Sequence, residues 1–495
     1  MNLSQRVALN TALLVASRAM VTISGLIGII VSTRYLGGVK FGQITTAIVF
    51  VTVLGFMTDA GLWTVAAREI ARRPEQEDSI LANVFTIGIV LSVVAIIVTL
   101  AAMELIYPGP ARAEVRLGIA ILAAQFVATA PGGVANAYTV ARQLAVPWTV
   151  GAAAAGVAFL GCLAVTLIAD LGFVGIAGSY AVVTIVNLLV PFGFVARRSS
   201  IRLGFDYRLW RQLVRWALVQ GGLLAAGVIY LRIDTVLLSI LGTSTDVAQY
   251  GLGYRVVDVL VLGPTFVMTT LFPQLARSAP HSERLRELTQ GAWSATALVA
   301  VPVLILFGGL APEIVTVTAG QSFHAAASVL ELLSLSVSIT FFNAVLLNAL
   351  VALGQQAGLL RVLVGVLALN VALNCLLIPL LAAKGTAVTL IVTEAVLLLI
   401  VLRLYARWGT APRIHAPGRL ACAGGGLAAV VVASRILVQP SSTAAALVVL
   451  ILTGALGTGL YVLVLRVLGA IPPEVREALR ALRQPRGTEA GLGGP

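Results

Sequence analysis

The sequence predicts an all-α integral membrane protein with about fourteen transmembrane helices. The chain has 495 residues, of which 59% are hydrophobic and only 11% are charged, whereas a soluble domain carries about 25% charged residues. Its mean hydropathy is +1.01. Apolar runs of about 20 residues, the length of a helix that crosses a bilayer, recur along nearly the whole chain. A water-soluble fold could not bury this much apolar surface.

Each apolar run defines one expected helix. We place these helices, in chain order, at residues 8–33, 42–66, 80–104, 115–140, 148–170, 173–195, 213–241, 246–276, 291–312, 325–352, 360–381, 385–405, 418–437 and 443–466. The first run follows MNLSQR, which has the positively charged start of a signal peptide. Because the run is long, is interrupted by Arg18 and is followed by no clear cleavage site, we expect it to be retained as the first span.

The positive charges indicate the orientation. If the N-terminus is cytoplasmic, the inside connections carry about four times as many Arg and Lys residues as the outside ones. We therefore expect both termini in the cytoplasm. This placement also explains the net charge of +13, because arginines on short inside loops face anionic phospholipids, and it disfavours binding to nucleic acid. In the tail PPEVREALRALRQPRG, one helical face would carry Val475, Leu479 and Leu482, which predicts an interfacial helix, with a solvated tail as the alternative.

Cysteine and histidine usage predicts no metal site and no cofactor. The three cysteines, Cys162, Cys375 and Cys422, are widely spaced and lie in or beside apolar runs, so we interpret them as small core residues. The three histidines, His281, His324 and His415, fall in predicted connections. We interpret them as solvated residues.

An internal repeat relates the first twelve spans. Gly37 and Arg72 are as far apart as Gly242 and Arg277, and at a second constant offset Gly175, Ala177 and Arg197 match Gly385, Ala387 and Arg407. We therefore expect four parts: a six-helix bundle at 1–198, a second six-helix bundle at 199–407, two additional transmembrane helices at 408–468 and a basic cytoplasmic tail at 469–495. Many secondary transporters are built from such repeats, with the binding site between them.

Several short motifs add a family resemblance. They are RYLG at 34–37, FGQ at 41–43, DAGL at 59–62 and REIA at 68–71, followed in the second half by Arg232, Asp234, Gly242, Gln249, Tyr250, Tyr254 and Arg255. With this span layout, the chain resembles the multidrug/oligosaccharidyl-lipid/polysaccharide exporter superfamily and, within it, the polysaccharide-unit flippases of the Wzx type. The resemblance implies two bundles in a V around a cationic cavity, in a bacterial inner membrane. It also implies alternating-access transport of an undecaprenyl-pyrophosphate-linked oligosaccharide, in partnership with polysaccharide polymerase and assembly machinery.

Three arginines, Arg18, Arg232 and Arg255, lie away from the ends of predicted spans, and a charge near the bilayer centre costs at least about 2.5–3.5 kcal/mol. Arg232 and Arg255 lie about 14 Å below the outer boundary, near the midplane, and Arg18 lies on the inner half. We expect all three to line the cavity, with Arg232 and Arg255 binding the pyrophosphate, because guanidinium suits a diphosphate in a partly dry site. In the alternative, Arg232, Asp234, Arg255 and Asp258 neutralise one another and hold two helices together.

Carboxylates at similar depth are candidates for ion coupling. Glu394 falls near the midplane without a charged neighbour in the sequence, so we expect it to carry a coupling proton. Asp234 and Asp258 are weaker candidates because arginines stand near them, and a sodium ion is the alternative coupling ion. Two polar pairs, Asn370 with Asn374 and Thr184 with Asn187, each share a helix face, and we expect them to hold helices together rather than to bind sugar.

Other functions fit the sequence less well. A lipid II flippase has the same architecture. A cation-coupled exporter of small cationic compounds is disfavoured by a cationic cavity and by the twelve spans usual in drug antiporters. A membrane-embedded polymerase or ligase would need acid/base residues on a long outside loop, and no outside connection exceeds about a dozen residues. We therefore expect a transporter and not an enzyme.

Overall fold

The structure is a computed structural model that describes residues 3–199, 201–278, 282–408, 410–438, 440 and 442–471. Within these ranges, the side chains of residues 3–19, 219–220, 223–224, 262, 265–267 and 269–270 are not described. The side chain of Arg18, the whole of His281 and the predicted interfacial helix therefore lie outside the described residues.

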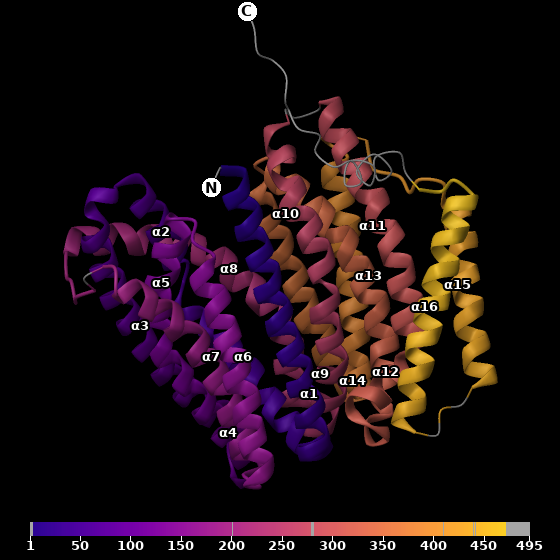
Figure 1. Ribbon diagram of the computed structural model, residues 1–495, viewed down its shortest axis with the longest axis horizontal. Coiled ribbons are helices and arrows are strands. Elements are labelled where there is room, and N and C mark those ends of the chain that lie inside the picture. The colour runs from indigo at the N-terminus through magenta and orange to yellow at the C-terminus, as the bar shows by residue number, and fades with distance from the viewer. Residues whose placement is uncertain are drawn as a thin grey trace, which may run out of the picture. The chain divides into compact units, whose positions relative to one another are not determined.

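The described residues form helices and no strand (Figure 1). The α-helices are α1 Leu3–Gly55, α2 Leu62–Arg72, α3 Glu77–Ile106, α4 Ala113–Ala123, α5 Thr129–Ala141, α6 Val146–Ile168, α7 Gly172–Ala196, α8 Tyr207–Leu241, α9 Ser244–Leu260, α10 Leu262–Arg277, α11 Glu283–Gly309, α12 Ala311–Ala319, α13 Ala325–Ala352, α14 Gln356–Tyr405, α15 Pro417–Leu437 and α16 Thr443–Val467. Short 3₁₀ helices, η1 to η5, cover Phe56–Thr58, Pro74–Gln76, Pro110–Arg112, Ala124–Ala128 and Gln321–Phe323.

Ten helical stretches among the described residues are long and apolar enough to cross a membrane. Two of them, Met20–Arg72 and Gln356–Tyr405, each run through two of the spans expected from the sequence, although Met20–Arg72 includes the first span only from residue 20. Non-helical backbone separates the two spans in both cases, at Gly37 (φ 72°) in α1 and at Ala382 (φ 50°) in α14. The prediction of an all-helical membrane protein is confirmed, and the number fourteen stays a prediction.

Three predicted spans are interrupted well inside their length, and the span at 291–312 also passes from α11 to α12 near its end. The span at 42–66 is interrupted by η1 and by left-handed backbone at Ala60 and Gly61 before α2 begins. The span at 115–140 passes through η4 between α4 and α5, close to Pro131, which lacks the N–H needed for a regular helix. The span at 246–276 changes from α9 to α10 at Val261, just before Pro264. Hydropathy alone could not reveal these interruptions, because they depend on local backbone geometry.

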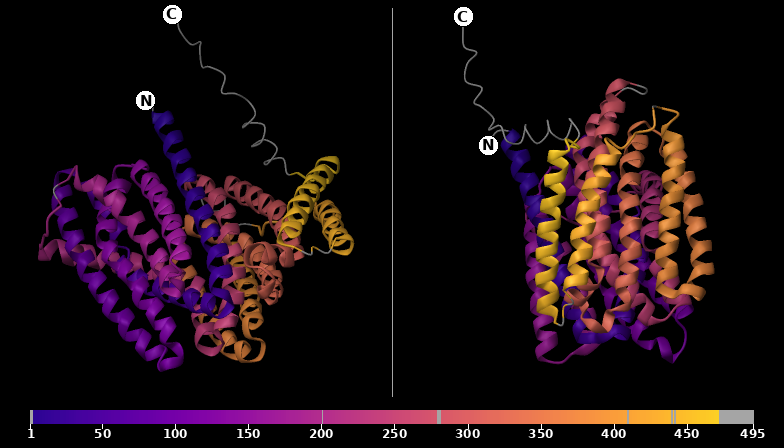
Figure 2. Two further views of the ribbon diagram at one scale, coloured as in Figure 1. Left: turned by 60° about the horizontal axis from the view of Figure 1, so that its bottom comes forward. Right: turned by 90° about the vertical axis from the view of Figure 1, so that its right-hand side faces the viewer.

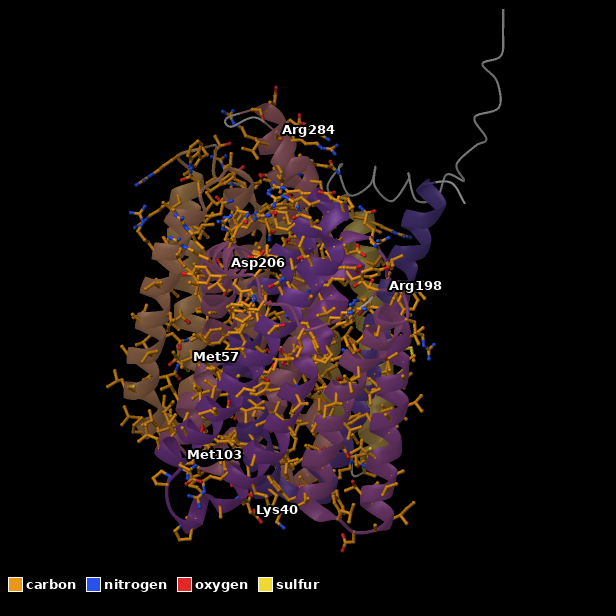
Figure 3. All side chains as sticks on the ribbon, turned by 90° about the vertical axis from the view of Figure 1, so that its left-hand side faces the viewer. Lys40, Met57, Met103, Arg198, Asp206 and Arg284 are labelled. Carbon is orange, nitrogen blue, oxygen red and sulfur yellow. The ribbon has the colours of Figure 1, made fainter. Side chains whose placement is uncertain are left out.

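Contacts between Cα atoms divide the chain into two compact units. The first unit contains Met1–Leu252, Thr318–Ala326 and Asn370–Thr386, and the second contains Gly253–Val317, Ala327–Leu369 and Ala387–Pro495. These units are defined by contacts and not by the internal repeat, so they do not test the domain boundaries predicted from the sequence. Those boundaries stay predictions. Within the first unit, Lys40 and Met103 lie toward one end of the helices, and Arg198 and Asp206 lie toward the other (Figure 3). That arrangement is consistent with the orientation expected from the charges.

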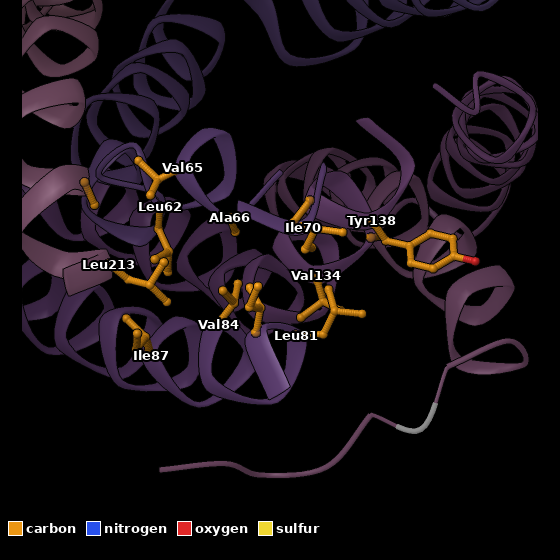
Figure 4. Close-up of a cluster of buried hydrophobic side chains, with 14 of the residues drawn as sticks. Leu62, Val65, Ala66, Ile70, Leu81, Val84, Ile87, Val134, Tyr138 and Leu213 are labelled. Carbon is orange, nitrogen blue, oxygen red and sulfur yellow. The ribbon is translucent and has the colours of Figure 1, made fainter. Parts of the chain in front are cut away.

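A buried hydrophobic cluster holds the first unit together around α2, α3, α5 and α8 (Figure 4). Leu62 and Ile70 of α2, Val84 of α3, Val134 of α5 and Leu213 of α8 are all at most 4% exposed. Helices that pack closely in a membrane need small residues at the contact. Gly133 is such a residue, because a Cβ added to it would lie only 2.0 Å from Nε1 of Trp63.

In the second unit, α15 and α16 run side by side and pack against α11 (Figure 2). Gly309 and Gly424 permit close approach, because an added Cβ on either would crowd Val431 or Val301. The hydroxyl of Tyr461 donates a hydrogen bond of 2.9 Å to the main-chain carbonyl of Leu298. Large apolar side chains on the other faces of α15 and α16 stay exposed, as expected for helices that face lipid.

Candidate functional site

Asp234 belongs to a buried polar cluster in the first unit. It lies on α8, about 10 Å from the end of that helix at Leu241. Its carboxylate accepts a hydrogen bond of 2.8 Å from the side-chain amide of Asn374 and one of 3.2 Å from the hydroxyl of Tyr250. The amide of Asn374 also lies 3.0 Å from Oδ1 of Asn370. All four residues are at most 1% exposed.

Two helix ends bring this cluster together. Gly242 ends α8, and the carboxylate of Asp246 accepts from the main-chain N–H and the hydroxyl of Thr243, which fixes the tight turn into α9. The turn places Tyr250 beside Asp234. The first segment of α14 then supplies Asn370 and Asn374, shortly before the break at Ala382.

The cluster contains polar atoms that the described residues leave without a hydrogen-bond partner. They are Oδ1 of Asn374 and Nδ2 of Asn370. Leaving such a group buried and unsatisfied costs about 1–3 kcal/mol, so native structures retain few of them. A carboxylate with neighbouring amide oxygens can hold a hard monovalent cation or can take up a proton. The role of Asp234 in ion coupling stays a prediction.

Glu394 lies in the second unit and is hydrogen-bonded. Its carboxylate accepts a bond of 2.7 Å from the side-chain amide of Asn343 on α13, and the same amide donates to the main-chain carbonyl of Glu394 at 3.0 Å. Glu394 is 4% exposed and Asn343 is 1% exposed. The sequence offers Glu394 no partner nearby, and the structure supplies one from a helix about fifty residues earlier.

Arg255 and Asp258 lie on one face of α9 in the second unit, as their spacing predicts. Their closest nitrogen and oxygen are 4.0 Å apart, and their side chains are 30% and 32% exposed. An ion pair of this length and exposure contributes little stability. A half-exposed guanidinium of this kind is able to contact an anion as well as its neighbouring carboxylate.

The other two candidate arginines lie on α8 and α1. Arg232 is half-buried in the first unit, two residues before Asp234 and therefore on the opposite side of α8. Arg18 lies on α1, and its side chain is outside the described residues. The joint role of Arg18, Arg232 and Arg255 stays a prediction.

The FGQ motif takes part in a close helix contact that the sequence did not predict. All seven residues at 41–47 are buried, although Gln43, Thr45 and Thr46 are polar. A Cβ added to Gly42 would lie only 1.7 Å from the carbonyl oxygen of Ser244 on α9, and one on Gly251 would lie 2.7 Å from Thr45. The second segment of α1 therefore packs backbone to backbone against α9 at the end predicted to be outside.

Further contacts close the same end of the first unit. The hydroxyls of Tyr107 and Ser239 lie 2.6 Å apart, and Arg112 donates a bond of 2.8 Å to the main-chain carbonyl of Ser239. Burial raises the pKa of the Tyr107 hydroxyl, so this group stays protonated and can donate. The connection between α3 and α4 is thereby fastened to the end of α8. These bonds and the contact of α1 with α9 lie at the end predicted to be outside, and we call the set Gly42, Tyr107, Arg112, Ser239 and Ser244 the outer seal.

Other motif residues have structural contacts. In REIA, Glu69 is buried, and one of its carboxylate oxygens lies 3.6 Å from nitrogens of both Arg68 and Arg72. The guanidinium of Arg68 also lies over the ring of Trp216. The pair Thr184 and Asn187 lines a cavity of about 220 Å³ in the first unit, together with Ser24 of α1 and Tyr180.

Comparisons with known proteins agree with this architecture. The family model described as polysaccharide biosynthesis protein matches residues 7–279, which is more than half of the chain. The probable low-salt glycan biosynthesis flippase Agl15 of Haloferax volcanii is 25% identical over 172 residues. That alignment covers 34% of this chain and 36% of the relative, so the chain matches about a third of that protein's length.

Solved structures show the same fold. The lipid II flippase MurJ, in an inward closed conformation, has a TM-score of 0.74 over 96% of this chain and 100% of that chain, at 11% identity. An inward-facing multidrug resistance MATE family transporter of the MOP superfamily has a TM-score of 0.67 over 78% of this chain and 94% of that chain, at 15% identity. The expected architecture of the exporter superfamily is confirmed at the level of the fold.

Proposed function

The chain belongs to the polysaccharide biosynthesis protein family, and we propose from this membership that it is a flippase for a lipid-linked oligosaccharide in cell-surface polysaccharide biosynthesis. The observation that carries the proposal is the family match over residues 7–279, which extends from residue 7 in α1 past the end of α10. The similarity to a probable glycan flippase and the transporter fold support it. A transporter also accounts for the buried polar groups inside apolar helices. In a protein that serves only as a scaffold, these groups would destabilise the membrane helices without serving a function.

The proposed cargo is an oligosaccharide on undecaprenyl pyrophosphate, moved from the inner to the outer leaflet. The pyrophosphate would contact Arg232 and Arg255, and Arg18 would extend the basic surface toward the inner leaflet. Guanidinium groups bind phosphate oxygens through two parallel hydrogen bonds. The half-buried position of Arg232 and the weak ion pair of Arg255 support this role, because neither side chain is fully enclosed.

Transport would proceed by alternating access. The outer seal supports a starting state that is closed on the outside, since Gly42 and Ser244 approach as closely as their backbones allow. Release of cargo to the outer leaflet then requires the α1–α9 contact to separate. In this scheme the seal residues do not touch the cargo, and they set which side of the membrane is open.

A monovalent cation or a proton is the proposed coupling ion. Asp234 could bind either one, since its carboxylate lies beside the amide groups of Asn370 and Asn374. Glu394 is the second candidate and would act by taking up and releasing a proton beside Asn343. Ion binding at Asp234 would neutralise a buried charge on α8, the helix whose end is part of the outer seal.

The proposal includes the setting of the protein. We place it in a bacterial inner membrane with both termini in the cytoplasm, and we expect polysaccharide polymerase and assembly machinery to receive its cargo. The arginines of its inside connections would contact anionic phospholipids.

Reconstitution tests the proposed function. The full-length protein would be placed in liposomes that hold an undecaprenyl-pyrophosphate-linked oligosaccharide, and an external lectin would report its appearance in the opposite leaflet. We expect translocation well above that of protein-free liposomes, with the glycan unchanged in length. Translocation of lipid II alone would assign the chain to the lipid II flippases, and lengthening of the glycan would identify a polymerase.

A further inference from the structure

The inner end of the first unit carries a groove that the proposed function does not use. It lies between α6 and α7 and has a volume of about 770 Å³, within the range of about 300–1,000 Å³ that is usual for ligand sites. Its apolar part is formed mainly by Val150, Leu189, Val190 and Phe194, and two arginines, Arg197 and Arg198, stand at its rim. None of the described lining residues is acidic. The groove is therefore apolar along the helices and positive where the helices end.

The arginines of this groove are held in place by the fold. Both follow Ala196, the last residue of α7, at the end of the helix where positive charge is favoured. The guanidinium carbon of Arg198 lies 3.6 Å from the centroid of the Phe194 ring. This cation–π contact aligns one guanidinium with the groove wall, while Arg197 stays exposed. Val150 and Leu189, on the apolar wall, are 52% and 41% exposed.

A second, smaller groove that is also mainly apolar and has an arginine in its lining lies in the second unit. It has a volume of about 220 Å³, and its lining includes Leu350, Leu359, Leu404, Arg407 and Trp408. Arg407 is exposed, and Trp408 is half-buried at the end of α14. Tryptophan beside arginine at a helix end is typical of the membrane–water boundary. Again none of the described lining residues is acidic.

The two grooves occupy equivalent positions of the internal repeat. The offset that relates Arg197 to Arg407 also relates Phe194 to Leu404 and Arg198 to Trp408, and all six residues line one groove or the other. The same offset relates Gly172, which has φ 57°, to Ala382, which has φ 50°. It further relates Gly175 to Gly385, and an added Cβ on either one would collide with residues of the preceding helical segment or turn. The agreement of backbone breaks, close contacts and grooves argues that each half contains one such site.

We propose that both grooves bind an anionic phospholipid of the inner leaflet. The phosphate would contact Arg197 in the first groove and Arg407 in the second, and an acyl chain would lie along the apolar wall. Charge complementarity favours this occupant, because a basic rim attracts anionic headgroups that face the cytoplasm. An apolar wall without acidic groups suits the lipid chain. The proposal does not depend on the identity of the cargo, but it rests on the proposed orientation, in which both termini lie in the cytoplasm.

Native mass spectrometry of the full-length protein in detergent tests the proposal, with phosphatidylglycerol as the probe and phosphatidylcholine as the comparison. We expect two molecules of phosphatidylglycerol to bind more tightly than the rest. R197Q/R198Q should weaken one of them about tenfold, R407Q should weaken the other to a similar extent, and the combined variant should lose both. R197K/R198K should keep most of the binding, because the charge remains.

The matched control is R208Q/R211Q, which removes two exposed arginines at the start of α8 that line neither groove. This control should leave both tight lipids bound. The proposal is overturned if the control loses them equally, since the binding would then be unspecific surface attraction, or if neither groove variant weakens binding. It is also overturned if undecaprenyl pyrophosphate displaces phosphatidylglycerol from both grooves at low molar ratio, which would identify them as sites for the cargo. Size-exclusion profiles and thermal unfolding establish that each variant is folded.

Discussion

The side-chain amide of Asn374 donates a hydrogen bond of 2.8 Å to the carboxylate of Asp234, a residue 140 positions earlier in the chain. The exposed fraction is 1% for Asp234 and 0% for Asn374. The bond connects α8 to the first segment of α14 inside the first unit, and Tyr250 adds a third helix to the cluster. A buried carboxylate that accepts hydrogen bonds from two other helices links the position of those helices to its own charge.

Asp234→Asn should therefore uncouple transport from its ion. The substitution keeps the size of the side chain and removes the charge that a proton or sodium ion would neutralise. We expect translocation in liposomes to become independent of the sodium and proton gradients, and the thermal stabilisation of the protein by added sodium to disappear. Asn348→Ala is the control, because the Asn348 amide donates within its own helix, to the carbonyl of Ala344. A gradient dependence that survives in Asp234→Asn would remove this cluster from coupling.

Glu394→Gln should slow transport and flatten its pH dependence while binding of the cargo stays largely intact. Glutamine still accepts the hydrogen bond from Asn343 through its carbonyl oxygen, so the packing of α13 and α14 should survive. The measurement is the initial rate of translocation across a series of pH values. Glu331→Gln, which removes a half-exposed carboxylate paired with Arg435, serves as the control. An unchanged pH profile in Glu394→Gln would mean that this residue carries no coupling proton.

Arg232→Ala and Arg255→Ala should reach the membrane normally and fail to support export of the polysaccharide. Losing one charge-assisted contact costs about 1.5–3 kcal/mol, which corresponds to roughly a ten- to hundredfold loss of binding. Lysine should rescue only partly, because it keeps the charge without the planar fork. The measurement is binding of the undecaprenyl-pyrophosphate-linked oligosaccharide to each purified variant.

The pair of Arg255 and Asp258 separates this role from a structural one. If the ion pair only stabilises α9, Arg255→Ala should lower thermal stability, and adding Asp258→Ala should restore both stability and export. Recovery of export in the double variant would therefore exclude Arg255 from cargo binding.

Gly42→Leu should open the outer end of the first unit. Any side chain at Gly42 collides with the backbone of Ser244, and such overpacking costs about 1–3 kcal/mol. We expect a cysteine placed at Thr45 to react with a membrane-impermeant thiol reagent only when Gly42 is replaced, after Cys162, Cys375 and Cys422 have been changed to alanine. Gly38→Leu is the matched control, since an added Cβ there meets nothing within 4 Å. Equal labelling in both variants would show that the contact does not close this end.

Thiol labelling also tests the topology. A cysteine at Thr245, which is exposed at the start of α9, should react with an impermeant reagent added outside intact cells. One at Ser199, just after α7, should react only after the membrane is made permeable. The reverse pattern would invert the orientation on which the two grooves and the outer seal are placed.

The sequence by itself determined that this chain is helical and lies in a membrane. Hydrophobic runs and the distribution of arginines are properties of consecutive residues, so spans such as 148–170 and 173–195 correspond closely to α6 and α7. The spacing of Arg255 and Asp258 likewise predicted their shared face, because positions three apart on a helix are always neighbours. Counting residues also predicts that Arg232 and Glu394 lie near the midplane, and this depth stays a prediction.

Only the tertiary structure decided which partner each polar group has. Glu394 had no partner in the sequence and receives one from Asn343, and Asp234 is bonded by Asn374 and Tyr250, from two other helices. The contact of Gly42 with Ser244 could not be predicted from the sequence either. A glycine in a span indicates that another helix approaches closely, but not which residue of that helix it meets. Helical periodicity fixes the direction of a side chain from its own axis. The neighbour that it meets depends on how distant helices pack, and that information is spread over the whole chain.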